Sequence, residues 1–274
     1  METRQIRLAD GRSIKFDVDH KAGAANYFVL GVRKSGSSIM NSMMESLARI
    51  NGRNYVGIAG RLFGQNIPEK DWRTDPAVLQ LFAPGNVYGG FRAMPLVFEQ
   101  SPVFQAARKI LLVRDPRDAL VSEYFSNAYS HSLPGKGAAS AGGAREQMLN
   151  LREAALATRI EDYVLSRAKP LNQTLMEYAA VARDKQTRLF RYEEVIFDKR
   201  GWLRDIAAHF SWTAGSPAFL DGMMSWADVV PTAERNTEFV RKVTPGDHKD
   251  KLGPETIAKL DALLREPMRI FGYA

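Results

Sequence analysis

An apolar run followed by a short loop of small and basic residues constrains this chain more than any other stretch. Residues 27–30 read YFVL, residues 31–38 read GVRKSGSS, and apolar residues at helical spacing begin at Ile39. This order predicts a buried strand, a tight loop and a helix start, which leave several backbone N–H groups pointing at one spot. Such a spot binds an anion. Four side chains of the loop add donors or positive charge there: Arg33, Lys34, Ser37 and Ser38.

The loop departs from the nucleotide-binding pattern GxxxxGK[ST] at one position. Gly31 and Gly36 have the spacing of the pattern, but Ser37 stands where the lysine belongs, and the cation lies inside the loop at Lys34. The loop therefore indicates a site for a phosphate-type anion and speaks against an ordinary nucleotide kinase or ATPase. The alternative is a turn of glycine and serine residues that carries two basic residues by chance and binds nothing. A second anion-binding site elsewhere in the sequence would decide between the two interpretations.

The composition sets wide bounds. A chain of 274 residues without an obvious linker is long enough for one large α/β domain, so we expect residues 1–274 to form a single domain. The net charge of +7 and the pI near 9.6 suit an anionic ligand without requiring one. The chain has no cysteine, which excludes disulfides, thiolate metal sites and cysteine nucleophiles.

The N-terminal residues 1–20 alternate apolar and polar side chains around Asp10-Gly11, which predicts a β-hairpin before the main fold. Charges stand where a signal peptide needs an apolar core, and no run approaches the ~20 apolar residues of a membrane-spanning helix. We therefore expect a cytoplasmic protein with no membrane span. The sequence indicates no nucleic-acid partner and leaves the oligomeric state open.

A second strand-to-helix junction follows in the middle of the chain. Residues 109–113 read as a buried strand, and Asp115 before a proline is a natural start for the next helix. Arg114 then lies at the carboxyl end of a parallel strand, where α/β sheets place their ligands. Ser122, two turns into the helix, is close enough to share one anion with Arg114. In the alternative reading, Arg114 pairs with Asp118 and Ser122 only packs.

The second half of the chain is mainly helical in prediction. Residues 133–143 are rich in glycine and alanine, which predicts a mobile loop or lid. A helix is expected from Arg145 to about Ala168, ending at Pro170, with another over 171–184 and a strand over 187–192.

Four stretches taken together resemble the sulfotransferases that use 3′-phosphoadenosine 5′-phosphosulfate (PAPS). In chain order they are KSGSS at 34–38, VRDPRDALVSEY at 113–124, RYEEV at 191–195 and RKVTPGDHKDKL at 241–252. The resemblance runs from about Tyr27 to Tyr273 and implies a three-layer α/β/α fold with a central parallel sheet. It also implies transfer of a sulfonyl group from PAPS to a hydroxyl or amine of an acceptor, such as a carbohydrate, a lipid-linked sugar or a small alcohol.

The resemblance implies a role for each matching residue. The loop binds the 5′-phosphosulfate, and Lys34 is the catalytic residue that meets the oxygen bridging phosphorus and sulfur. Arg114 and Ser122 bind the 3′-phosphate, and Tyr192 lies against adenine. The basic pair 241–242 closes over the 3′-phosphate. The complete predicted donor site is Arg33, Lys34, Ser35, Gly36, Ser37, Ser38, Arg114, Ser122, Tyr192, Arg241 and Lys242.

Two departures from the family pattern concern how the donor is held. Ile39 replaces a tryptophan that stacks on adenine in many members, and Val243 replaces the glycine that usually follows the basic pair. A third departure concerns the base, because residues 91–95 lack the histidine that cytosolic members carry there. Glu45, Glu99 and His131 are the candidates for this base, and Arg92 either faces a ligand or lies on the surface.

No metal is expected, because Lys34 and its neighbours supply the charge that magnesium gives a kinase. Two other functions stay open at this stage. A P-loop kinase with a displaced lysine predicts magnesium-dependent ATP binding. A non-catalytic nucleotide-binding protein on the same fold is conceivable because the usual base histidine is missing.

Overall fold

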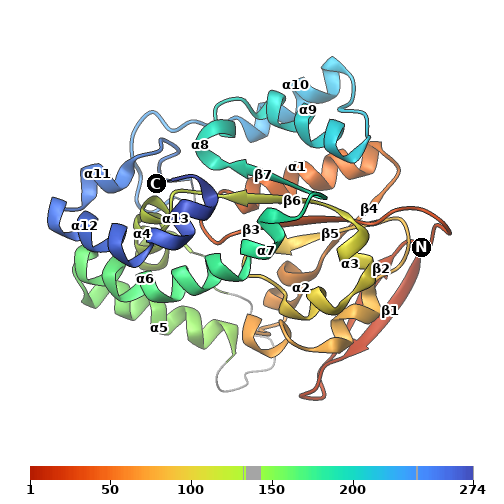
Figure 1. Ribbon diagram of the computed structural model, residues 1–274, viewed down its shortest axis with the longest axis horizontal. Helices are drawn as coiled ribbons and strands as arrows, with labels where there is room; N and C mark the ends of the chain where they lie inside the picture. Colours follow the sequence, from red (N-terminus) through yellow and green to blue (C-terminus); the bar gives the residue numbers. More distant parts are fainter. Residues whose placement is uncertain (132, 134–142, 239, 274) are drawn as a thin grey trace.

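The computed structural model describes residues 1–131, 133, 143–238 and 240–273. A five-stranded parallel sheet forms the centre, with the strand order β4-β5-β3-β6-β7 (Figure 1). The strands are β3 (Tyr27–Gly31), β4 (Asn54–Gly57), β5 (Asn86–Phe91), β6 (Arg108–Val113) and β7 (Thr187–Arg191). The predicted α/β fold with a central parallel sheet is therefore confirmed.

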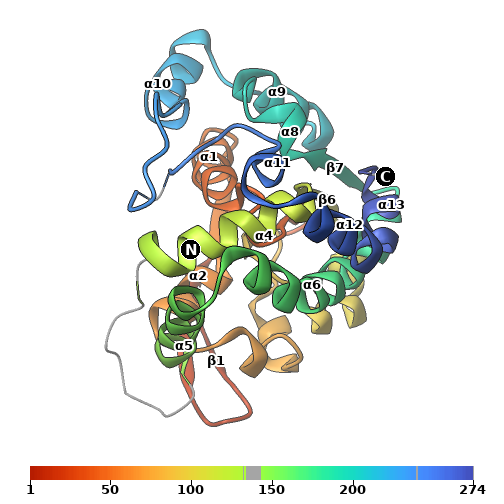
Figure 2. The same ribbon diagram turned by 90° about the vertical axis from the view of Figure 1, so that its left-hand side faces the viewer.

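Alternating side chains of the strands build two separate layers of core. Tyr27 and Val29 of β3 pack with α1 (Ser37–Ile50), α9 (Lys199–Phe210) and α10 (Pro217–Ala227). Phe28 and Leu30 face the other side of the sheet. On that other side they pack with residues of α2, α4 and α6. Figure 2 shows these layers from the side, with α9 and α10 at one end and α5 and the hairpin at the other. Both faces of the sheet are covered, so its strands read as continuous apolar runs.

The strand register brings three loops to one edge of the sheet. Tyr27 of β3 is level with Val87 of β5 on one side and with Arg108 of β6 on the other. Because parallel strands of similar length then end together, the loop after β3, Arg92 after β5 and Arg114 after β6 meet at the carboxyl edge. This is the edge at which open α/β sheets bind ligands.

The predicted N-terminal hairpin is confirmed, with β1 (Glu2–Arg7) paired antiparallel to β2 (Ser13–Val18). Gly11 in its turn has φ 89°, which a side chain would strain. The hairpin buries Ile6, Ile14 and Phe16 against the core.

The expected helix end at Pro170 is wrong. The chain breaks earlier, at the extended residues Thr158 and Arg159, between α5 (Ala144–Ala157) and α6 (Ile160–Glu177), and α6 continues through Pro170. A proline inside a helix costs about 3 kcal/mol. The four apolar residues that α6 buries on the same side contribute about 1 to 3 kcal/mol each, which offsets that cost. They are Val164, Ala168, Leu171 and Leu175.

The remaining helices connect and cover these elements. They are α2 (Ile58–Gly64), α3 (Pro102–Ala106), α4 (Pro116–Phe125), a π-helical turn (Ser126–Ser130), α7 (Ala179–Arg183), α8 (Tyr192–Val195), α11 (Asp247–Lys251), α12 (Pro254–Leu263) and α13 (Arg265–Phe271). Three short 3₁₀ helices span Glu69–Asp71, Pro76–Leu81 and Leu96–Gln100. In the described part of the chain, no helix combines the length and the apolarity needed to span a bilayer. Most of the predicted lid, residues 134–142, lies outside the described residues.

Candidate active site

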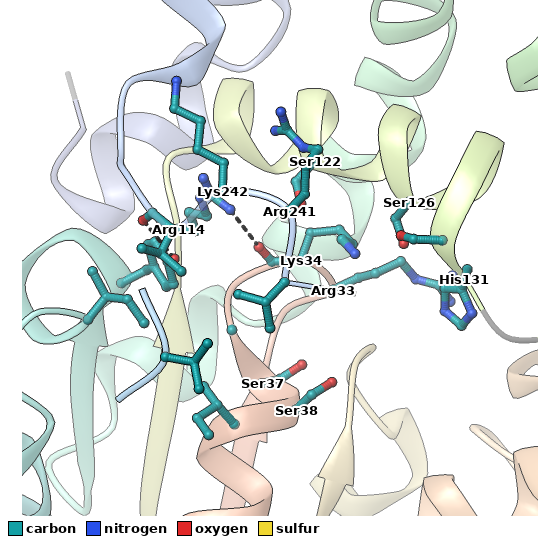
Figure 3. A pocket seen from close by; sticks show the side chains of 18 of the residues that line it. Arg33, Lys34, Ser37, Ser38, Arg114, Ser122, Ser126, His131, Arg241 and Lys242 are labelled. Atoms are coloured by element: carbon teal, nitrogen blue, oxygen red, sulfur yellow. Dashed lines mark hydrogen bonds between the residues drawn. The ribbon is translucent and has the colours of Figure 1, made fainter. Parts of the chain in front are cut away.

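One cavity of about 210 Å³ opens at the carboxyl edge of the sheet, and ten of the eleven predicted donor-site residues line it (Figure 3). The exception is Ser35, which is fully buried. The Ser35 hydroxyl donates a hydrogen bond to the carbonyl of Val32 at 2.6 Å and the Ser35 N–H binds the same oxygen at 3.1 Å. Ser35 therefore shapes the loop from inside and does not face the cavity.

The loop before α1 exposes backbone donors to the cavity. Lys34 (φ 66°) and Gly36 (φ 88°) both adopt the left-handed conformation, and the ring of Tyr192 lies so close that a Cβ at Gly36 would be 3.0 Å from it. Gly36 provides no side-chain cap for α1, and the first turn of α1 holds no acidic residue. The first N–H groups of a helix lack partners within the helix, so an anion is their natural acceptor here.

Lys34 lies among cations with little to balance its charge. Burial lowers the pKa of its ammonium group to about 7. Repulsion from Arg92 and other cavity arginines contributes to this decrease, while the Glu123 carboxylate opposes it. In the free protein the Lys34 ammonium group therefore loses its proton far more easily than an exposed lysine, and an anion in the cavity favours its charged form.

Arg114 is a buried guanidinium group with poorly satisfied donors. It is only 7% exposed, and its Nε has no hydrogen-bond partner in the described chain. The other two nitrogens make only long hydrogen bonds: Nη1 lies 3.5 Å from the carbonyl oxygen of Lys34, and Nη2 lies 3.5 Å from the Asp118 carboxylate. The guanidinium carbon lies 4.5 Å from the ring centre of Tyr192, which supports it from one side. A buried guanidinium group whose hydrogen-bond donors lack close partners in the protein indicates a ligand at this place.

Asp118 connects Arg114 to the C-terminal segment. Its carboxylate accepts hydrogen bonds from the N–H of Gly246 at 2.7 Å and of His248 at 3.0 Å, and contacts the His248 ring at 2.6 Å. Burial disfavours the charged form of Asp118, but His248 and Arg114 together with these N–H groups hold its pKa well below the usual range. Asp118 stays ionised and fixes the segment that carries the basic pair beside Arg114.

Arg241 and Lys242, the basic pair, line the cavity, but carboxylates of the protein already balance their charges. Arg241 binds the carboxylates of Glu234 and Asp247 and lies 4.2 Å above the ring of Phe125. Lys242 Nζ is 2.9 Å from Asp247 and 3.1 Å from Asp250. An anion entering the cavity would have to share these cations with the carboxylates.

The opposite wall of the cavity follows the end of α4. The π-helical turn exposes Ser126 and Ser130 to the cavity, and His131 follows directly. In Figure 3, Arg114 lies on one side, Ser126 and His131 lie on the other, and Arg33 runs from the loop toward His131. π-Helical turns are frequent at functional sites.

The three candidates for the base occupy different places. Glu45 is 60% exposed beside Arg49, and Glu99 lies on the surface, so neither lines the cavity. His131 does line it. Arg92 is also in the cavity wall, where its Nη2 lies 3.3 Å from the Ser38 hydroxyl, so it faces the site.

Several cavity residues were missed from the sequence. Ser126, directly after α4, follows Ser122 by one helical turn, and this spacing was a signal that could have found it. Lys199 of α9, Trp226 of α10 and Val229 just after α10 come from distant parts of the chain, and no local pattern marks them as neighbours of the loop.

The comparisons with known proteins decide the family. The sulfotransferase domain family matches residues 25–272. The chain belongs to this family. The prediction that it is an enzyme of the PAPS-dependent sulfotransferase class is therefore confirmed, and no match to a curated protein was found.

Solved structures agree on the fold of this sulfotransferase. A mouse sulfotransferase, SULT7A1 complexed with PAP, superposes with a TM-score of 0.58 at 15% identity, over 91% of this chain and 86% of the other. Retinol dehydratase in complex with androsterone and the inactive cofactor PAP gives 0.50 at 13% identity, over 97% and 90%. At these identities the likeness extends to the fold alone.

Proposed function

We propose that this sulfotransferase transfers the sulfonyl group of PAPS to a hydroxyl or amine of an acceptor bound between Lys34 and His131. The observation that carries the proposal is the buried Arg114, whose Nε lacks a partner and which lies in one cavity with the uncapped start of α1. Two anion-binding ends fit a nucleoside with a phosphate at each end. The PAP in the mouse sulfotransferase and retinol dehydratase structures supports this choice of donor.

In the proposed reaction an acceptor oxygen or nitrogen attacks sulfur, a new bond to sulfur forms, and the bond from sulfur to the bridging oxygen breaks. The electron pair of the broken bond stays on the phosphate oxygen. Lys34 lies where this charge develops, so its ammonium group stabilises the transition state more than the ground state. The N–H groups at the start of α1 hold the same phosphate.

His131 takes the acceptor proton in this proposal. It is the imidazole among the described residues that line the cavity, and none of these residues is a carboxylic acid. Its position across the cavity from Arg114 leaves the space between them for the reacting groups (Figure 3). A positioned base contributes about 10²–10⁴ in rate, so His131→Ala should lose this factor in kcat and keep its affinity for PAP.

A second histidine serves as the control for the His131 experiment. His209 is half-buried on α9 and its ring nitrogen contacts the carbonyl of Lys109 at 3.0 Å, far from the cavity wall. His209→Ala should therefore keep its turnover once its folding is verified. A fall in kcat of less than about threefold in His131→Ala would remove His131 from the reaction.

The apolar end of the cavity is the proposed site for adenine. The Arg114 guanidinium carbon lies 4.5 Å from the centre of the Tyr192 ring, and Gly36 lies close to one edge of the ring, so Tyr192 offers adenine less free surface than an exposed aromatic side chain would. Trp226 of α10 lines the same cavity and is 43% exposed. We assign adenine to Trp226 and its neighbour Val229, with Tyr192 as support for Arg114.

The two other functions make opposite predictions for ligand binding. A displaced P-loop kinase would bind ATP together with magnesium, and would not prefer PAP. A non-catalytic nucleotide-binding protein would bind PAP without turnover.

A thermal-shift titration with PAP, beside ATP plus magnesium, tests the proposed donor. A ligand present at 100 times its Kd stabilises the folded state by about 2.7 kcal/mol, which corresponds to several degrees in Tm. We expect this rise with PAP and little change with ATP plus magnesium. The reverse order would favour a kinase, and binding without transfer of labelled sulfonyl groups would favour the non-catalytic protein.

A further inference from the structure

Two arginines meet between the anion loop and the end of β5. The N–H of Arg33 donates to the carbonyl of Arg92 at 3.0 Å, so the backbone holds the two residues side by side. Both side chains line the cavity. Arg33 belongs to the predicted donor-site loop, but the proposed donor binding uses Lys34 and the α1 N–H groups at one phosphate and Arg114 at the other, which leaves both guanidinium groups unassigned. Their placement therefore calls for a separate explanation.

Arg92 is an uncompensated charge. Within the described ranges no carboxylate forms an ion pair with it, whereas Arg33 has the Glu69 carboxylate at 3.1 Å. Burial lowers the pKa of Arg92, and the charge of Arg33 lowers it further. A half-buried guanidinium group beside a second one is unfavourable in the free protein and becomes favourable when an anion lies between them.

The direction of Arg33 separates this pair from the 3′-phosphate end. Figure 3 shows Arg33 running away from Arg114, toward Ser126 and His131. The ion pair with Glu69 orients Arg33 from behind and leaves part of its fork of five N–H donors for another oxyanion. Arg33 therefore extends toward the side of the cavity that we propose for the acceptor, and Arg92 lies in the cavity wall beside Ser38.

We propose that Arg92 and Arg33 bind an oxyanion of the acceptor, so that the enzyme sulfonates molecules that already carry a carboxylate, sulfate or phosphate group. This inference rests on the proposed function, because it names the acceptor class for the same site. Arg92 supplies most of the selectivity, because Arg33 shares its charge with Glu69. The hydroxyls of Ser126 and Ser130 lie on the same wall for the neutral part of the acceptor.

Matched acceptors that differ in charge test the proposal. One set is 4-hydroxybenzoate, 4-hydroxybenzyl alcohol and tyramine, and a second set is glucuronic acid, glucose and glucosamine, each assayed with labelled PAPS. We expect the acidic member to have a kcat/KM about tenfold or more above its neutral partner, from charge-assisted hydrogen bonds. Arg92→Gln should remove this preference, and Arg92→Lys should restore part of it.

Binding measured without turnover keeps the test decisive for weak acceptors. Ligand-observed NMR on PAP-saturated enzyme should give 4-hydroxybenzoate a Kd about tenfold below that of 4-hydroxybenzyl alcohol, and Arg92→Gln should make the two equal. Arg61→Gln is the matched control, because Arg61 is an exposed arginine of α2 outside this cavity. It should leave the difference intact.

Three results would overturn the proposal. The acidic members could show no advantage over their neutral partners, or their advantage could survive in Arg92→Gln. Arg92→Gln could also weaken PAP by tenfold or more, which would place Arg92 at the 5′-phosphate of the donor through its contact with Ser38. Failure of the proposed function is separate, because it appears as no PAP binding to the wild-type enzyme.

Discussion

The two ends of the cavity handle positive charge in different ways. At the start of α1, the charges of Lys34 and Arg92 have no carboxylate partner in the described chain, and burial lowers the pKa of each. At the other end, Arg241 and Lys242 bind acidic side chains closely, and Arg114 lies 3.5 Å from Asp118. One end is electrostatically strained before a ligand arrives, and the other is largely neutralised.

This difference indicates a division of labour. A cation without a carboxylate partner stabilises developing negative charge most strongly, because it does not have to leave a carboxylate of the protein first. A cation that already binds a carboxylate gives a ligand less net energy but keeps a fixed geometry. We therefore expect substitutions at the α1 end to change the rate, and substitutions at the other end to change recognition of the donor.

Lys34→Ala should have the largest effect. Removing a charge that acts on the leaving oxygen should lower kcat about 10²–10³-fold, while the Kd for PAP changes about threefold or less. Single-turnover kinetics and calorimetry measure the two quantities. Lys259→Ala, an exposed lysine of α12, is the control. Equal losses in kcat and affinity would erase the proposed difference between the two ends.

Arg114→Ala should show the complementary pattern. Loss of a buried guanidinium group that faces the 3′-phosphate should weaken PAP by roughly 10- to 100-fold and leave adenosine 5′-monophosphate nearly unchanged. Arg117→Ala is the matched control, because Arg117 binds Asp115 and Asp261 outside the cavity. If both nucleotides lost affinity equally, Arg114 would have no special relation to the 3′-phosphate.

The pH dependence of PAP binding sharpens the comparison further. The pKa of Lys34 is about 7 in the free protein, and a bound phosphate raises it, so binding above pH 7 takes up a proton. Affinity therefore falls as pH rises through 7, by no more than the roughly threefold loss expected for Lys34→Ala. Calorimetry between pH 7 and pH 8 in buffers of different ionisation enthalpy should show uptake of a fraction of a proton. The uptake should vanish in Lys34→Ala and persist in Lys242→Ala.

The parts of this site that were predictable from sequence are those set by local chemistry. The apolar run before Gly31 and the glycines of the loop define a strand, a turn and a helix start within a dozen residues. Asp115 likewise predicts the start of α4, because an acidic cap before a proline satisfies helix N–H groups locally, and its carboxylate does accept from the N–H of Arg117. Parallel strands then bring both junctions to one edge.

The parts that were not predictable depend on packing between distant segments. The inward turn of Ser35, the direction of Arg33 and the approach of Trp226 depend on neighbours far away in the chain. Pro170 was read as a helix end because its local cost is large, whereas burial of one face of α6 outweighs that cost. The base could not be chosen because spacing alone does not say which candidates reach the cavity.

The smallest expected effect tests the neutralised end directly. Lys242 Nζ shares its charge between Asp247 and the 66% exposed Asp250. Asp250→Asn should therefore free part of that charge and tighten PAP by about twofold, since exposed ion pairs contribute about 0–1 kcal/mol. Asp162→Asn, an exposed residue of α6 outside the cavity, removes the same charge from the protein as a control. Equal tightening in both variants would reduce the effect to net charge, and weaker binding in Asp250→Asn would separate Lys242 from the nucleotide. Tightening in Asp250→Asn alone would mean that carboxylates at this end limit the affinity for the donor.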